Sequence, residues 1–76
     1  MCYTNCSVDR VETDEFGNPK TVYIRRDTGK TFAVFYSVLK MTHITREATG
    51  IPDEGLALII DRTIEIADNA RILLAH

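Results

Sequence analysis

The C-terminal stretch from Ile51 to His76 restricts the possible folds of this chain more than any other part of the sequence. Beyond its first turn it contains no proline or glycine, and its apolar residues recur with the period of a helix. Pro52 suits the first helical turn, because its missing N–H would have no partner there. Asp53 and Glu54 place negative charge near the positive end of the helix dipole. The sequence therefore predicts one long helix over residues 52–75, against which the rest of the chain must pack.

The predicted helix carries more apolar surface than a small core requires. Its apolar side chains cover an arc of roughly 200°, against a stripe of about 100° on a helix that packs on one core. One side of the arc is expected to face the protein's own sheet, and the other a second helix, a second subunit or a target. Packing within the chain, with scattered surface leucines, is the alternative explanation. The residues assigned to the interface are Leu58, Ile59, Ile66, Ile72 and Leu73.

Length and charge narrow the class of protein. A chain of 76 residues forms a single domain with a marginal core, and oligomerisation is a common way to add to such a core. The net charge of −2 gives no general attraction to nucleic acid or to anionic membranes. Residues 1–40 contain six Lys and Arg against five Asp and Glu, whereas residues 41–76 contain three against six. The sheet half is thus weakly basic and the helical half acidic.

The N-terminus, from Met1 to Cys6, has neither the basic region nor the apolar region of a signal peptide. No apolar run approaches the ~20 residues that span a bilayer. These features lead us to expect a cytoplasmic protein without a membrane partner, whose cysteines stay reduced. Residues 1–5 are expected to form a flexible tail.

Two β-rich runs, residues 21–26 and 31–36, flank the tripeptide Asp27-Thr28-Gly29. Hairpin loops of three residues often combine a type I turn with a left-handed glycine, and Gly29 suits that position. A hairpin with this loop pairs Arg26 with Lys30. The same register brings four apolar side chains onto one face, the expected surface for the C-terminal helix. These four residues are Val22, Ile24, Phe32 and Val34.

The opposite face of the hairpin is half polar, and its surroundings are basic. Such side chains could bind an anion or a partner protein. The candidates for this contact are Tyr23, Arg25, Arg26 and Lys30.

The remaining segments leave alternatives open. Residues 6–13 could form a first strand, but Val8 and Val11 have opposite parity, so strict alternation does not support it. Residues 37–43 could extend the second strand of the hairpin or begin a helix. The fold class predicted is α+β: an antiparallel hairpin or three-stranded sheet over 6–36, followed by a short helix and the long C-terminal helix.

The short helix is expected over residues 45–48. Thr42 or Thr45 would cap its N-terminus, and Gly50 is a natural stop. The segment between the hairpin and this stop, residues 37–50, connects the sheet to the C-terminal helix.

No motif identifies a chemistry. Cys2, Cys6, His43 and His76 could in principle bind zinc, but zinc sites use tight ligand pairs separated by a loop, and these histidines are far apart. No carboxylate pair, no Ser/Cys–His arrangement and no complete cofactor motif can be placed. We therefore predict no catalytic residues, no metal and no cofactor.

Residues 44–56 resemble the middle of many bacterial helix-turn-helix regulators, with a helix, a glycine followed by isoleucine, and a second helix. The resemblance implies DNA binding, with the basic hairpin as a second contact. Arg46, however, stands four residues before Gly50, where the motif usually has a small residue. Asp53 and Glu54 would also face the phosphates. A DNA-binding regulator is therefore kept as the alternative function.

The apolar excess of the C-terminal helix predicts a small non-enzymatic interaction protein. It would self-associate as a homodimer through that helix and bind another macromolecule, a protein. In size, mild acidity and order of elements the chain is similar to small accessory proteins of phages and plasmids, including inhibitors of host defence systems. A third hypothesis is a small-ligand binder whose pocket forms between subunits, with Tyr23, Arg25, Arg26 or His43 touching an anion.

Overall fold

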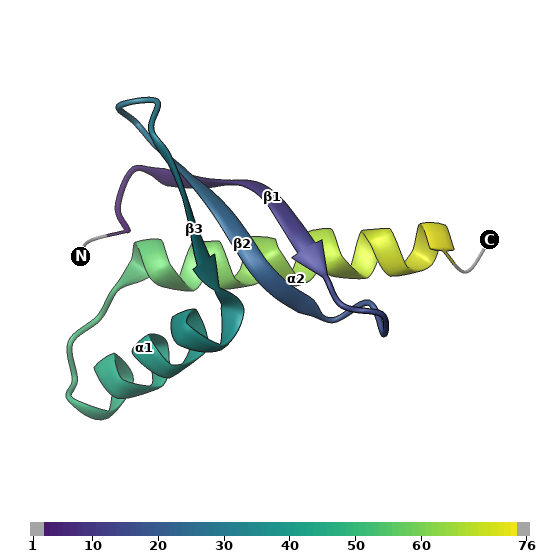
Figure 1. Cartoon of the computed structure of the whole chain (residues 1–76). Helices are drawn as coiled ribbons and strands as arrows, with labels where there is room; N and C mark the ends of the chain where they lie inside the picture. The colour runs from purple at the N-terminus through teal and green to yellow at the C-terminus, as the bar shows by residue number, and fades with distance from the viewer. Residues whose placement is uncertain (1–2, 75–76) are drawn as a thin grey trace.

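The computed structural model describes residues 3–74 as a three-stranded sheet with two helices (Figure 1). The elements are β1 (Cys6–Thr13), β2 (Pro19–Arg26), β3 (Thr31–Phe35), α1 (Tyr36–Ala48) and α2 (Glu54–Leu74). The strands are antiparallel and lie in the order β1-β2-β3. The predicted α+β class, with a short helix and then a long C-terminal helix, is confirmed.

The β2–β3 hairpin has the predicted loop and register. Gly29 has a φ of 87°, the left-handed conformation that the loop requires. The Arg26 N–H donates to the Lys30 carbonyl oxygen at 2.8 Å and closes the loop. Ile24 pairs with Phe32, and Val22 pairs with Val34 in the same register. The four apolar side chains therefore share one face of the sheet, as the loop predicted.

β1 is a strand, and a β-bulge explains why its sequence does not alternate. Val8 pairs with Ile24, whereas Arg10 pairs with Tyr23, so Asp9 is an extra residue between two ladder positions. After the extra residue, the alternation of side chains between the two faces of β1 is shifted by one position. Val8 and Val11 consequently both lie half-buried, although they have opposite parity in the sequence.

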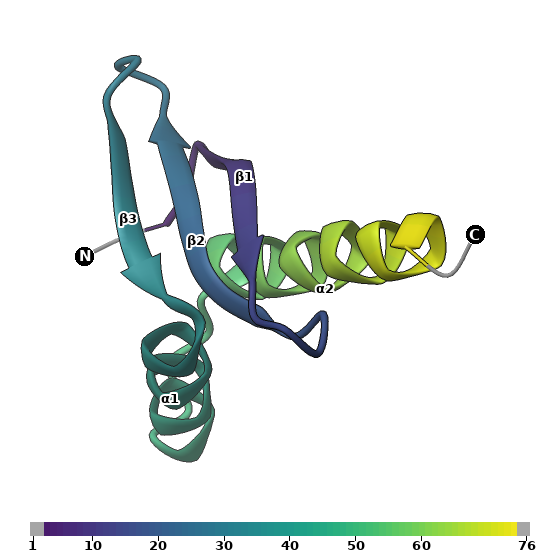
Figure 2. The same ribbon diagram turned by 45° about the vertical axis from the view of Figure 1, so that its right-hand side comes forward.

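Both helices bury side chains against the face of the sheet that carries Val22 and Ile24. Leu39 of α1 and Leu56 of α2 belong to the same core cluster as these two residues, and all four side chains have no exposed surface. α2 packs across β1 and β2, whereas α1 packs beside β2 and β3 (Figures 1 and 2). The predicted apolar face is thus shared between the two helices.

The N-terminal segment is packed at Tyr3, so the expectation of a flexible tail is wrong for this residue. Tyr3 is 8% exposed and belongs to the core cluster. Its backbone crosses α2 at Gly55, where an added Cβ would lie 2.6 Å from the Tyr3 carbonyl carbon and oxygen. A residue without a side chain is required for the two backbones to come this close.

α1 is longer than the predicted helix at residues 45–48, because residues 37–43 are helical and do not extend β3. Thr42 and Thr45 lie inside the helix and do not cap it. Their hydroxyls donate to the carbonyl oxygens of the residues four positions earlier, at 2.8 and 2.9 Å. The residue before the first turn is Phe35, which is extended and offers no side-chain cap. This N-terminus therefore has no capping signal in the sequence.

Gly50 ends α1 as predicted. It has a φ of 72°, and its N–H donates to the Glu47 carbonyl oxygen at 3.1 Å. The Ile51 N–H donates to the Arg46 carbonyl oxygen at 3.0 Å, which completes a Schellman-type C-terminus.

α2 begins two residues after Pro52, which therefore precedes the N-cap and does not occupy the first turn. Asp53 is the N-cap, because its Oδ1 accepts a hydrogen bond from the Leu56 N–H at 3.1 Å. A short polar side chain that accepts this hydrogen bond determines where the helix starts.

Candidate functional site

The side of α2 that packs within the chain is narrower than the apolar arc of its sequence. Its buried residues are Leu56, Ile59, Ile60, Thr63 and Ala67. Ile59, which the sequence assigned to the interface, is 2% exposed and lies in the core cluster. Thr63, which the sequence did not place in the core, is tolerated there because its hydroxyl donates to the Ile59 carbonyl oxygen at 2.7 Å.

The packed side of α2 becomes uncovered toward the C-terminus. Ile59, Ile66 and Leu73 are seven residues apart and lie on one side of the helix, since seven residues complete nearly two turns. Ile59 is 2% exposed, Ile66 is half-buried and Leu73 is 76% exposed. Figures 1 and 2 show the reason, because the C-terminal turns of α2 continue past the edge of the sheet at β1. Ile72, which is 57% exposed, lies about 100° around the helix from Leu73. We call Ile66, Ile72 and Leu73 the α2 overhang.

Leu58 does not belong to the overhang. It lies about 20 Å along the helix axis from Ile72, given a rise of 1.5 Å per residue. It is 68% exposed and lines a shallow groove with Cys6, Ser7 and Val8 at the start of β1. The predicted interface residues thus divide into a core residue, a groove residue and the α2 overhang.

The overhang is anchored to the rest of the molecule by Arg71. One guanidinium nitrogen, Nη2, lies 3.3 Å from the Gly17 carbonyl oxygen and 3.2 Å from Asn18 Oδ1. Both acceptors belong to the β1–β2 turn, more than fifty residues earlier in the chain. These contacts hold the last turns of α2 in a defined position relative to the sheet.

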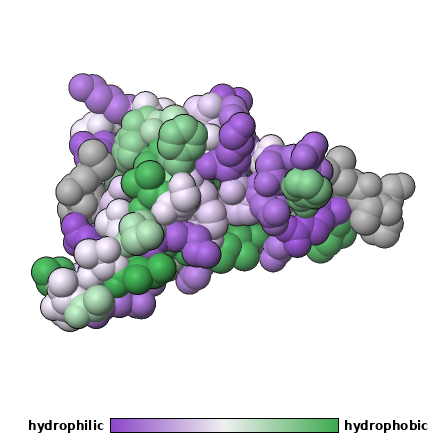
Figure 3. Space-filling view, turned by 60° about the horizontal axis from the view of Figure 1, so that its bottom comes forward, coloured by the Kyte–Doolittle hydropathy of each residue, from purple (hydrophilic) through white to green (hydrophobic). Residues whose placement is uncertain are grey.

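A second apolar surface, which sequence reasoning missed, lies on α1 and the end of β3. Its side chains are all about half exposed or more: Phe35 60%, Val38 48%, Met41 64% and Ile44 56%. Hydrophobic surface continues from the sheet onto α1 in the space-filling view (Figure 3). On an α-helix, Val38, Met41 and Ile44 follow one another around an arc of about 120°, and a helix starting at Tyr36 would have revealed this exposed arc. We call these four residues the α1 face.

The hairpin candidates Tyr23 and Arg25 are occupied by contacts within the chain. The Tyr23 hydroxyl donates to Glu12 Oε1 at 2.8 Å, and the Arg10 guanidinium lies 4.1 Å from the Tyr23 ring centroid. The hydrogen bond to Glu12 raises the pKa of Tyr23 above its ordinary value. Arg25 forms an ion pair with Asp9, the bulge residue, at 2.9 Å.

Arg26 and Lys30 do not join these two residues in one site. Arg26 has the parity of Ile24 and lies on the opposite face from Arg25, with its guanidinium 5.5 Å from the Phe32 ring centroid. Lys30 is exposed at the start of β3. The four hairpin residues therefore do not form a single anion site in this structure.

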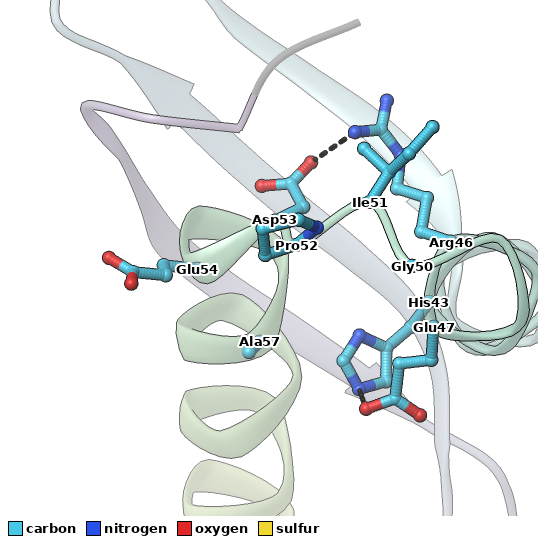
Figure 4. Close-up of a pocket in the computed structure, with 9 residues that line it drawn as sticks. All are labelled: His43, Arg46, Glu47, Gly50, Ile51, Pro52, Asp53, Glu54 and Ala57. Carbon is cyan, nitrogen blue, oxygen red and sulfur yellow. Dashed lines mark ion pairs between the residues drawn. The ribbon is translucent and has the colours of Figure 1, made fainter.

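A cleft of about 580 Å³ separates the end of α1 from the start of α2 (Figure 4). Two side-chain contacts lie along it. The ion pair of Arg46 with Asp53 has Nη1 3.1 Å from Oδ2, and His43 Nε2 lies 3.1 Å from Glu47 Oε1. Glu54 adds a further carboxylate to the wall. Arg46, the arginine that lines the cleft, already has an acidic partner, so the cleft offers little attraction to an anionic ligand.

The candidate zinc ligands are not assembled in the described part of the chain. Within residues 3–74 no group of three His, Cys, Asp or Glu side chains could hold a metal ion. His43 pairs with Glu47, and Cys6 Sγ lies 3.8 Å from the Thr4 carbonyl oxygen. Cys2 and His76 fall outside the described residues. In the same range, neither helix has the length and apolar character of a membrane span.

Comparisons of the chain with protein-family models, with curated proteins and with solved structures find no match. Two of the candidate sites, the α2 overhang and the α1 face, are exposed apolar surfaces on helices that pack against the sheet.

Proposed function

We propose that this chain is a small non-enzymatic interaction protein that self-associates through the α2 overhang and binds a protein partner. The observation that carries the proposal is the change in exposure along one side of α2, from 2% at Ile59 to 76% at Leu73. The helix keeps presenting apolar side chains after the sheet beneath it has ended. Apolar residues gathered on a positioned surface are characteristic of protein interfaces.

A second copy is the partner that suits this surface best. In a two-fold contact each copy contributes the same patch, so two overhangs could cover each other by antiparallel helix packing. Ile66 and Leu73 would then continue, between copies, the row that Ile59 begins inside one copy. Arg71, held at the β1–β2 turn, would lie at the rim of such a contact.

Sedimentation equilibrium of two matched variants tests the proposal. Leu73→Asp should dissociate the assembly, because a carboxylate would be buried between copies. Leu58→Asp makes the same change at a residue of similar exposure on the same helix, 68% against 76%, and should leave the assembly intact. Equal effects of the two substitutions, or none from Leu73→Asp, would contradict the assignment of the interface.

The DNA-binding alternative has one supporting observation, the order helix, short connection, helix formed by α1 and α2. The charge of α2 opposes it, since Asp61, Glu65 and Asp68 are exposed and Arg62 is paired with Glu65 at 2.9 Å. A fluorescence-anisotropy titration with mixed duplex DNA at low salt tests for DNA binding, because phosphate contacts are strongest at low salt. Binding that weakens steeply with added salt would favour DNA over the protein partner.

A further inference from the structure

β3 is an edge strand without the usual protection of edges. Natural edge strands are commonly guarded by charges, prolines or bulges, because their free backbone groups can pair with another chain. β1, the other edge, has a bulge at Asp9 and carries Arg10 and Glu12. β3 contains no charged residue, no proline and no bulge between Thr31 and Phe35.

The register shows which backbone groups of β3 are open. The Arg26 N–H donates to the Lys30 carbonyl oxygen, and hydrogen-bonded pairs alternate along an antiparallel ladder. Phe32, two residues after Lys30, therefore directs its backbone groups toward β2. Thr31 and Ala33 direct theirs away from the sheet, and no other strand of residues 3–74 lies on that side. These open groups fit an extended backbone.

Apolar side chains lie next to the open edge. Ala33 and Phe35 line a shallow depression with Val38, the first exposed apolar residue of α1. The α1 face continues from there through Met41 and Ile44. A segment added to β3 would thus meet apolar surface where it passes the start of α1 (Figure 3).

A lysine lies near each end of β3. The arginines of β2 do not add to this pair, because Arg25 forms an ion pair with Asp9 and Arg26 lies on the opposite face of the sheet from Arg25. Lys30 stands at one end of β3, and Lys40 lies over the Tyr36 ring at the other, 5.9 Å from its centroid. A segment with acidic residues at both ends would have complementary charge.

We infer that β3 is the docking site for an extended segment of a partner protein, which adds as a fourth strand, is apolar toward α1 and is acidic at its ends. A second copy fits the same edge less well. Two β3 strands paired antiparallel about Ala33 would place Lys30 of one copy opposite Tyr36 of the other. Because Lys40 lies over the Tyr36 ring, this pairing would bring two lysines together at each end.

This inference rests on the proposed role in protein binding, yet it can fail separately. β3 and the C-terminal end of α2 lie at opposite ends of the molecule (Figures 1 and 2). Self-association through the overhang would leave β3 accessible, and a Leu73→Asp monomer should still bind at β3.

Amide NMR of the full chain tests the inference with a synthetic peptide, Glu-Asp-Thr-Val-Thr-Val-Thr-Asp-Glu. Its addition should shift the amides of Thr31 and Ala33 and slow their hydrogen exchange. A peptide with lysines in place of the acidic residues should bind about two- to thirtyfold more weakly, the effect of two lost exposed ion pairs. In the Lys30→Glu variant the acidic peptide should lose affinity and the lysine peptide should gain it, so the difference between the two affinities should shrink.

Ala33→Pro removes one outward N–H and, at an edge position, should leave the β2 ladder intact while weakening peptide binding about tenfold or more. Ala33→Val keeps the N–H and serves as the matched control. The inference is overturned if the Thr31 and Ala33 amides do not respond up to millimolar peptide, or if both peptides bind alike to the wild type and to Lys30→Glu. Concentration-dependent protection of these amides without peptide would assign the edge to a second copy and also overturn it.

Discussion

The Arg46 guanidinium lies 3.1 Å from Asp53 Oδ2 and joins the last turn of α1 to the N-cap of α2. The Asp53 side chain is 5% exposed, so this ion pair is largely shielded from solvent. The other carboxylate oxygen of Asp53, Oδ1, accepts the capping hydrogen bond from the Leu56 N–H at 3.1 Å. One carboxylate thus starts α2 and also sets its position relative to α1, and with it the separation of the two apolar surfaces.

Asp53→Ala should lower the free energy of unfolding by about 1–3 kcal/mol, because it removes both the cap and the ion pair. Asp53→Asn retains a capping oxygen and should cost less than Asp53→Ala. Urea unfolding monitored by circular dichroism gives both values. Equal losses for the two variants would mean that the cap contributes little and that the pair with Arg46 dominates.

Gly55→Ala should destabilise the protein although alanine is the better helix former. The added Cβ would lie 2.6 Å from the Tyr3 carbonyl group and 2.8 Å from the Thr4 nitrogen, so the N-terminal segment must move. Overpacking of this kind costs about 1–3 kcal/mol, whereas helix propensity alone would add about 1 kcal/mol of stability. The sign of the change in thermal midpoint therefore decides whether this segment is packed on α2 in solution.

Alkaline pH should destabilise the fold, because the pKa of each of its three tyrosines is raised above 10.0. Burial and then Asp53 raise the pKa of Tyr3, the hydrogen bond to Glu12 raises that of Tyr23, and burial and then Asp61 raise that of Tyr36. The unfolded chain loses these protons first, so stability is full below pH 10 and falls as the pH rises through the folded values.

Ultraviolet titration of the phenols measures this effect directly. Glu12→Ala should lower the pKa of Tyr23 toward its ordinary value and leave those of Tyr3 and Tyr36 unchanged. Titration of all three phenols at the ordinary value, with stability independent of pH above 10, would contradict the packing of Tyr3 and Tyr36.

The hairpin and α2 were predictable because several signals agree. Gly29 indicated the type of loop, and the loop type determined the register of the two strands. That register places Val22 and Ile24 on the buried face of the sheet. The long run without helix breakers identified α2. Local propensity, alternation and turn chemistry all pointed to the same structure.

β1, the start of α1 and the exposed end of α2 could not be predicted from the sequence, because each depends on an irregularity or on tertiary packing. The bulge at Asp9 broke the alternation of β1. α1 has no capping residue at Phe35, and its exposed apolar residues obscured its packed side, on which Leu39 is buried. Ile59 and Leu73 follow the same helical pattern, and they differ in exposure only because the sheet ends between them. The extent of the sheet beneath a helix is a tertiary property, so the α2 overhang could not be separated from the core by sequence.

Static light scattering coupled to size exclusion, performed on the wild-type chain over a dilution series, tests self-association most directly. Self-association through the α2 overhang predicts a molar mass of twice 8.6 kDa at micromolar concentration, falling toward 8.6 kDa on dilution. A constant mass of 8.6 kDa across the series would contradict it.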